Sequence, residues 1–264
     1  MPDAVPPAVR ASLDDPFARL DGPLAGTRRL GFQVTESERI STSVQRVVLT
    51  APELHGFDYA PGQDVMLLVG TEGVRPVRRR YTIRELDRSA RLTLNIVRHA
   101  EGPGESWVAG SAPGDTIEGI GPRGKITTRP EADWHLFIGD ESAMPAIMAM
   151  TEALPGDAEA TLVIEVPDPA DEQELLAPAR TRLTWLHRLG APAGQADLLA
   201  AEAEQVELPS GRGQAYVFGE ASVVLRIREV LADRGLSAEQ VSAKAYWGRG
   251  RANAGHGEPA TAAR

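Results

Sequence analysis

The chain has 264 residues, a formal net charge of −9 and no cysteine. This length suits one large or two modest domains, and the acidic balance argues against a general nucleic-acid binder. The missing thiols exclude disulfides, a cysteine nucleophile, and cysteine-ligated zinc or iron–sulfur sites. With no apolar run near the ~20 residues of a membrane span and no visible secretory signal, we expect a cytoplasmic protein without stable membrane insertion.

Residues 1–27 are rich in Pro, Ala and Asp, which predicts a flexible arm. From residue 28 to residue 129, alternating segments punctuated by Pro and Gly predict an antiparallel β-barrel. Its six expected strands are residues 29–36, 44–50, 64–69, 79–85, 91–97 and 116–120.

From residue 130 to residue 253 the rhythm changes to strand–helix alternation, which predicts a parallel sheet with helices on both faces. The expected strands are residues 134–139, 161–166, 181–187, 214–218 and 242–246, and the expected helices are residues 143–154, 196–205 and 222–234. Residues 254–264 are interpreted as a tail. Ligands of such sheets bind at the carboxyl ends of the strands.

Charge differs between the two halves. Residues 75–98 hold eight Arg against two acids, whereas residues 130–179 hold twelve acids and no Lys or Arg. This asymmetry favours two domains with different partners. Plain solubility explains the acidic half equally well.

The basic half contains a strand that begins with three arginines, residues 78–84. Alternation places Arg80, Thr82 and Arg84 on one face and Arg79, Tyr81 and Ile83 on the other. Cations, a flat aromatic ring and a hydroxyl suit an anionic cofactor with a planar ring, such as a flavin dinucleotide. The alternative is an exposed basic edge strand.

Two glycine-rich turns follow this strand. His99 precedes the run Gly102-Pro103-Gly104-Glu105-Ser106-Trp107, which leads into a short helix. Glycines allow close backbone approach, and a helix N-terminus attracts phosphate. The second turn, residues 121–125, carries Arg123 and Lys125. Either turn is alternatively a plain connector.

Two further motifs lie at carboxyl ends of expected parallel strands. In the first, Asp140 and Glu141 precede Ser142, a suitable N-cap for the helix that begins near Pro145. Capping does not explain the two carboxylates. In the second, Trp247 stands beside Arg249 and Arg251, a set that can cover a ring system and hold an anion. The five histidines show no metal-ligand spacing, so we expect no metal site.

These motifs, in this order, resemble the siderophore-interacting protein family, the FAD-dependent ferric-siderophore reductases of the ferredoxin–NADP reductase superfamily. The resemblance runs from residue 28 to residue 253. It implies FAD bound mainly by the barrel, NADPH or NADH as electron donor, and a ferric siderophore whose iron is reduced and released. It requires no catalytic acid or base from the protein.

The resemblance also implies roles for single residues. Arg79 would pair with phosphate, Tyr81 would stack on the flavin ring and Thr82 would lie near its reactive nitrogen. The implied cofactor contacts are Arg79, Arg80, Tyr81, Thr82, Arg84, His99, Gly104, Ser106, Trp107, Asp140, Ser142, Ala143 and Trp247. The implied siderophore contacts are Lys125, Lys244, Arg249 and Arg251.

One residue departs from the family pattern. Gly248 stands where family members commonly carry Arg. This departure motivates one alternative, a flavin reductase of the same fold that supplies electrons to a biosynthetic partner. A second alternative, from a different class, is a non-catalytic siderophore-binding protein. The usual dinucleotide fingerprint is absent, so the sequence does not choose among NADH, NADPH and ferredoxin as donor.

Overall fold

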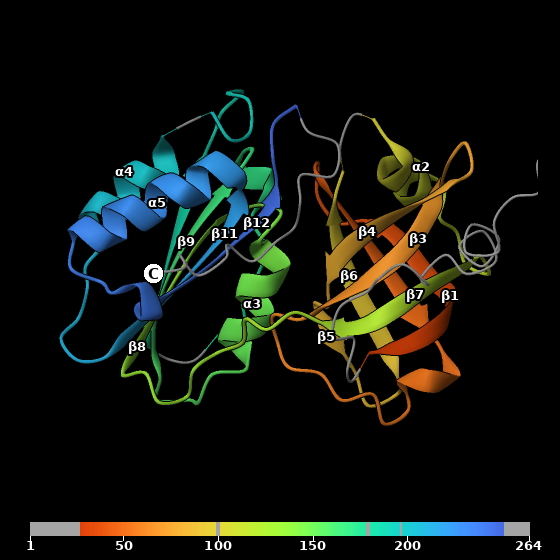
Figure 1. The fold of residues 1–264 in the computed structure, drawn as a ribbon, viewed down its shortest axis with the longest axis horizontal. Coiled ribbons are helices and arrows are strands. Elements are labelled where there is room, and N and C mark those ends of the chain that lie inside the picture. Colours follow the sequence, from red (N-terminus) through yellow and green to blue (C-terminus); the bar gives the residue numbers. More distant parts are fainter. Residues whose placement is uncertain (1–26, 99–100, 178–179, 196, 251–264) are drawn as a thin grey trace, which may run out of the picture. The chain divides into compact units, whose positions relative to one another are not determined.

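The computed structural model describes residues 27–98, 101–177, 180–195 and 197–250 (Figure 1). They form two compact units. The barrel unit comprises described residues up to 38 together with 46–59 and 63–125, and the sheet unit comprises 39–45, 60–62 and the described residues from 126 onward. Residues 39–45 and 60–62 belong to the sheet unit although they precede the end of the barrel unit in the sequence. The division therefore differs from the single boundary predicted after residue 129. Within the described ranges, no helix combines the length and apolarity needed to cross a bilayer.

The barrel unit is a curled antiparallel sheet of seven strands in the order β4-β3-β7-β1-β2-β6-β5. The strands are β1 (Arg28–Arg39), β2 (Val44–Thr50), β3 (Asp64–Glu72), β4 (Arg75–Thr82), β5 (Glu85–Leu86), β6 (Arg91–Val97) and β7 (Thr116–Arg123). The antiparallel fold is confirmed, but the predicted count of six strands is wrong.

The seventh strand arises where the expected strand at residues 79–85 changes partner. The Ile83 backbone N–H still donates to Gln63 O, just before β3, whereas the Arg84 N–H donates to Thr93 O, within β6. The chain therefore leaves β3 after Thr82 and continues as the short β5 against β6.

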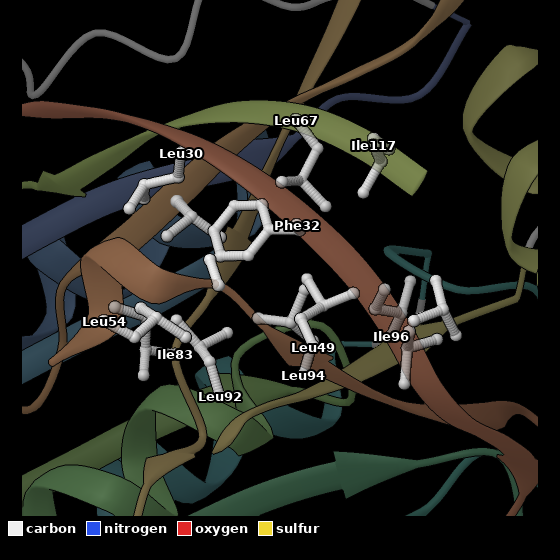
Figure 2. Close-up of a cluster of buried hydrophobic side chains, with 14 of the residues drawn as sticks. Leu30, Phe32, Leu49, Leu54, Leu67, Ile83, Leu92, Leu94, Ile96 and Ile117 are labelled. Carbon is white, nitrogen blue, oxygen red and sulfur yellow. The ribbon is translucent and has the colours of Figure 1, made fainter. Parts of the chain in front are cut away.

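Alternate residues of these strands fill the core of the barrel unit. Figure 2 shows Leu30 and Phe32 of β1 in the same buried cluster as Leu67 of β3 and Leu49 of β2. Burial of these side chains is the main favourable term for the fold. The helix α2 (Pro103–Gly110) packs against β3 and β4, and η1 (Pro52–Leu54) follows β2.

The sheet unit is a five-stranded parallel sheet in the order β10-β9-β8-β11-β12. The strands are β8 (Trp134–Asp140), β9 (Glu159–Val166), β10 (Arg180–His187), β11 (Gly213–Glu220) and β12 (Val241–Trp247). The helices are α3 (Met144–Glu152), α4 (Leu198–Gln205) and α5 (Ala221–Asp233), with 3-10 turns η2 (Pro169–Asp171) and η3 (Ala238–Gln240). The predicted parallel α/β architecture is confirmed.

Alternation along β8 builds a core on each face of this sheet. Phe137 packs into a cluster with α3, whereas Leu136 and Ile138 pack into a cluster with α4 and α5. Helices therefore cover both faces, as Figure 1 shows. The order of the strands places the ends of β8, β11 and β12 side by side.

The segment Arg39–Gln45, which runs from the last residue of β1 into the start of β2, belongs to the sheet unit. Ile40 and Val44 pack into the cluster around α3. The buried Asp171 accepts hydrogen bonds on Oδ1 from Ser41 Oγ at 2.6 Å, Ser43 N at 2.8 Å and Ser43 Oγ at 2.7 Å. This carboxylate therefore holds the segment in place.

Candidate functional site

The first part of the candidate site lies in the barrel unit, where β4 meets α2. Gly104, in the first turn of α2, packs directly on β4: a Cβ there would lie 3.2 Å from Arg79 Cγ and 3.1 Å from Tyr81 Oη. The N-cap residue Gly102 has φ 114°, and among the described residues no side chain caps the helix. A cation beside an uncapped helix N-terminus matches the chemistry of a phosphate group.

Tyr81 is held beside this turn by a second aromatic ring. The centroids of the Tyr81 and Trp107 rings are 5.8 Å apart and the planes are tilted by 31°. Both side chains pack on the core of the barrel unit. Burial raises the pKa of Tyr81 well above its usual range, so the phenol is neutral at physiological pH. The ring is therefore a fixed, uncharged surface next to Arg79.

On the opposite face of β4, Arg80 forms an ion pair with a buried carboxylate. Arg80 donates from Nε to Asp64 Oδ1 and Oδ2 at 2.9 and 3.0 Å, and its Nη2 also pairs with Asp64. Asp64 is only 2% exposed. The structure thus gives Arg80 a partner within the barrel unit, because the buried carboxylate needs a cation. The contact of Arg80 with the cofactor, which the resemblance implies, stays a prediction. Thr82, the last residue of β4, and Arg84, which lies beyond it, are half-buried.

The second part of the candidate site is the carboxyl edge of the parallel sheet, around Asp140. Asp140 Oδ1 accepts hydrogen bonds from Ser142 N at 2.9 Å and Ser142 Oγ at 2.5 Å. Its Oδ2 accepts from Glu220 N at 3.0 Å and Trp247 Nε1 at 2.8 Å. The prediction that Ser142 is the N-cap of α3 is therefore wrong. That position is Ala143, and the Ser142 hydroxyl serves Asp140 instead.

The neighbouring carboxylate, Glu141, has a separate partner. Arg188 donates from Nη1 and Nη2 to the two Glu141 carboxylate oxygens at 2.5 and 2.7 Å, and from Nη1 to Glu165 Oε1 at 3.1 Å. All three side chains are buried. The two acids before Ser142 thus have distinct roles: Asp140 binds the ends of other strands, and Glu141 neutralises a buried guanidinium.

Burial dominates the electrostatics of this edge. It raises the pKa of Asp140 to about 6, and the nearby charge of Glu141 acts in the same direction. Burial also raises the pKa of Glu165 to about 7, although pairing with Arg188 opposes the shift. One guanidinium thus lies among three buried carboxyl groups, and it does not offset the effect of burial on the pKa values of Asp140 and Glu165.

Sequence reasoning missed two residues of this edge. Glu220 accepts from Ser222 N and Val223 N at the start of α5 and from Arg249 N at 3.2 Å. Gly194, with φ 68°, packs so closely that a Cβ would lie 2.7 Å from Glu220 Cγ and 3.2 Å from Trp247 Cη2. Glu is an uncommon N-cap, so no pattern identified it.

Other predicted residues fall into three groups. Ala143 is fully buried against Gly139, so its side chain belongs to the core and not to a ligand surface. Lys244 is also buried, 6% exposed, with Nζ 5.3 Å from the Tyr246 ring centroid, so a bulky siderophore does not reach it. Lys125, Arg249 and Ser106 are exposed.

His99 and Arg251 lie outside the described residues. Within the ranges that are described, no cluster of three or more His, Asp or Glu side chains could hold a metal ion.

The comparisons with known proteins match both units. The siderophore-interacting FAD-binding domain matches residues 69–126, and the siderophore-interacting protein family matches residues 132–250. The ferric vibriobactin reductase ViuB of Vibrio cholerae is 32% identical over 236 residues, which cover 80% of this chain and 86% of ViuB. The NADPH-dependent ferric-chelate reductase of Escherichia coli K12 is 26% identical over 81% of this chain and 91% of its own.

A solved structure is also similar. A siderophore utilization protein from T. fusca superposes with a TM-score of 0.80 at 34% identity, over 88% of this chain and 97% of that chain. The two matching domains follow each other in the same order as the two units. The chain belongs to the siderophore-interacting protein family.

Proposed function

We propose that this protein is an FAD-dependent ferric-siderophore reductase, which takes electrons from NADPH or NADH and reduces the bound Fe(III) to Fe(II). The observation that carries the proposal is the uncapped first turn of α2, packed on Arg79 and Tyr81 in a domain of the FAD-binding family. Relatives named as ferric vibriobactin reductase and NADPH-dependent ferric-chelate reductase support the same reaction. We place the reaction in the cytoplasm, where NAD(P)H is available.

The residues of the barrel unit fit the cofactor. FAD, when bound, supplies the conversion of a two-electron hydride into one-electron steps. We assign Arg79 and the N–H groups at the start of α2 to the diphosphate, and the Tyr81 ring, held by Trp107, to the isoalloxazine. Thr82, Arg84, His99 and Ser106 complete the proposed contacts.

The substrate is an iron complex of hard oxygen donors. Such donors hold Fe(III) far more tightly than Fe(II), because the trivalent ion is harder and more highly charged, so a one-electron reduction releases the metal. We assign the exposed Lys125 and Arg249, together with Arg251, to the anionic complex. The protein needs no acid or base for this step; it positions donor and acceptor and excludes water.

The test is a direct assay of the purified protein. It should carry bound FAD, and anaerobic addition of NADPH or NADH should bleach the flavin absorbance. Adding catecholate and hydroxamate ferric siderophores with an Fe(II)-specific chromogenic chelator should then produce the coloured Fe(II) complex. A colourless protein that takes up no added FAD contradicts the proposal.

Gly248 supports a second candidate. It leaves no side chain between Trp247 and Arg249, at the proposed substrate end, where family members commonly carry Arg. In that case the protein is a flavin reductase that passes electrons to a biosynthetic partner. The same assay separates the two: NAD(P)H oxidation with a diffusible acceptor, but without Fe(II) formation from any ferric siderophore, favours the flavin reductase.

A further inference from the structure

The carboxylate of Asp140 is fully used within the protein. A carboxylate has about four lone-pair positions, and Asp140 receives four hydrogen bonds: two from Ser142, one from Glu220 N and one from Trp247 Nε1. The side chain is 3% exposed. Asp140 therefore has neither a lone pair nor the accessibility to bind a ribose hydroxyl or a nicotinamide amide.

The bond from Trp247 fixes the orientation of an indole ring at the end of β12. Indole has a single donor, Nε1–H, and Asp140 Oδ2 accepts it at 2.8 Å. A charged acceptor makes this a strong hydrogen bond. On the other side of the ring, Gly194 approaches so closely that its missing Cβ would lie 3.2 Å from Trp247 Cη2. The half-buried ring is thus held from two sides.

The same carboxylate joins three neighbouring strands. Asp140 ends β8, Glu220 ends β11 and Trp247 ends β12. Gly219, with φ 136°, permits this approach, because a Cβ there would lie 2.6 Å from Asp140 Oδ2. Glu220 adds a further attachment through Arg249 N. The segment from Trp247 to Arg249 is therefore attached to the sheet at both ends, whatever side chain stands at position 248.

We infer that Asp140 is a positioning residue, which holds the Trp247 ring in the orientation that sets the rate of hydride transfer from NAD(P)H and does not itself contact the nucleotide. This inference rests on the proposed function and on the position of Trp247 at the carboxyl edge of the parallel sheet, where such sheets bind their ligands. The charged groups around Asp140 are Glu141, Glu165 and Glu220, with Arg188 paired to the first two.

The test reads the indole N–H directly. In FAD-loaded, 15N-labelled protein, the side-chain spectrum should contain the indole signals of the four tryptophans, and the signal missing in Trp247→Phe identifies Trp247. We expect its exchange with solvent to become about tenfold faster in Asp140→Asn and Asp140→Ala. The control Glu165→Gln replaces another buried carboxyl of the same edge and should leave this exchange unchanged.

The second measurement is stopped-flow reduction of the flavin by NADPH and by NADH. Asp140→Asn and Trp247→Phe should each slow it about tenfold at unchanged FAD content. The double variant should be no slower than either single variant, because both remove the same hydrogen bond. A purely structural role for Asp140 would instead give additive losses.

Two outcomes overturn the inference: a Trp247 indole that stays equally protected in both Asp140 variants, or a loosened indole with an unchanged rate of flavin reduction. Failure of the proposed function looks different. If wild-type protein reduces no ferric siderophore, but indole exchange and flavin reduction still change together in the Asp140 variants, the inference stands and the reductase assignment falls.

Discussion

Arg80 and the buried Asp64 form an ion pair across β3 and β4, with both Asp64 oxygens 2.9–3.0 Å from Arg80 Nε. The strand that is richest in arginine thus divides its cations between two tasks. Arg80, on one face, neutralises a core carboxylate. Arg79, on the other face, lies against the first turn of α2.

Replacing Arg80 tests this division. Arg80→Met should lower the free energy of unfolding by about 3 kcal/mol, because it leaves a buried carboxylate without its cation. The nearby half-buried Arg123 limits the loss. Urea unfolding measures the change. The control Arg75→Met, at the exposed start of β4, should change it by less than about 0.5 kcal/mol. Equal losses in the two variants would contradict the assignment.

Gly104→Ala tests the cradle at the start of α2. The added methyl would lie 3.1 Å from Tyr81 Oη and 3.2 Å from Arg79 Cγ, so these side chains must move. Because Ala favours helices over Gly, folding should be little affected, whereas FAD affinity should fall about tenfold.

FAD titration of the stripped protein, followed by fluorescence, measures this affinity. Gly110→Ala is the matched control, since it adds the same methyl at the other end of α2, where, apart from its chain neighbours and the helix backbone, no atom of the described residues lies within 4 Å of the added carbon. It should leave FAD binding unchanged. If both variants lose affinity equally, the cradle is not the cofactor site.

The sequence predicted both sheets because alternation and strand–helix rhythm are local signals. It also separated the faces of β4, with Arg79 and Tyr81 on one side and Arg80 on the other. It did not reveal β5, since the exchange of partner at Ile83 and Arg84 depends on Gln63 and Thr93, which are distant in sequence. The roles of Asp140 and Glu220 were likewise hidden, because each depends on how neighbouring parallel strands end together.

The stability of the protein should depend on pH through Glu165. Its pKa is raised from 4.5 to about 7 in the folded protein. Between these values the folded state holds a proton that the unfolded chain has released. The stabilising contribution is therefore present in full below pH 4.5 and is lost as pH rises through about 7.

Urea unfolding at pH values from 5 to 8 measures this dependence. The free energy of unfolding should fall by about 1–3 kcal/mol over that range, and this fall is the pH slope compared below. Glu165→Gln should reduce the pH slope. Part of the slope should remain, because the pKa of Asp140 is also raised in the folded protein. Glu159→Gln, on the more exposed start of the same strand, should preserve the full slope. An unaltered slope in Glu165→Gln would show that this carboxyl is not the source.

Arg249→Ala tests the proposed siderophore contact. Its backbone N–H, which donates to Glu220, remains in the variant, so the end of β12 should keep its attachment. We expect KM for an anionic ferric siderophore to rise about tenfold, with a weaker dependence on salt and unchanged flavin reduction by NADPH. Arg226→Ala, an exposed arginine of α5, is the control and should change neither value. An unaltered KM in Arg249→Ala would remove Arg249 from the substrate site.

The segment Arg39–Gln45 decides how the molecule can be divided. Ile40 and Val44 fill the core around α3, and Ser41 and Ser43 supply the three hydrogen bonds to Asp171 Oδ1. A fragment that begins after residue 125 lacks these four residues. It would expose the apolar side chains around α3 and leave Asp171 Oδ1 without its three donors. A single cut therefore does not yield two independent domains, because the sheet unit includes residues 39–45 and 60–62 from within the first half of the chain.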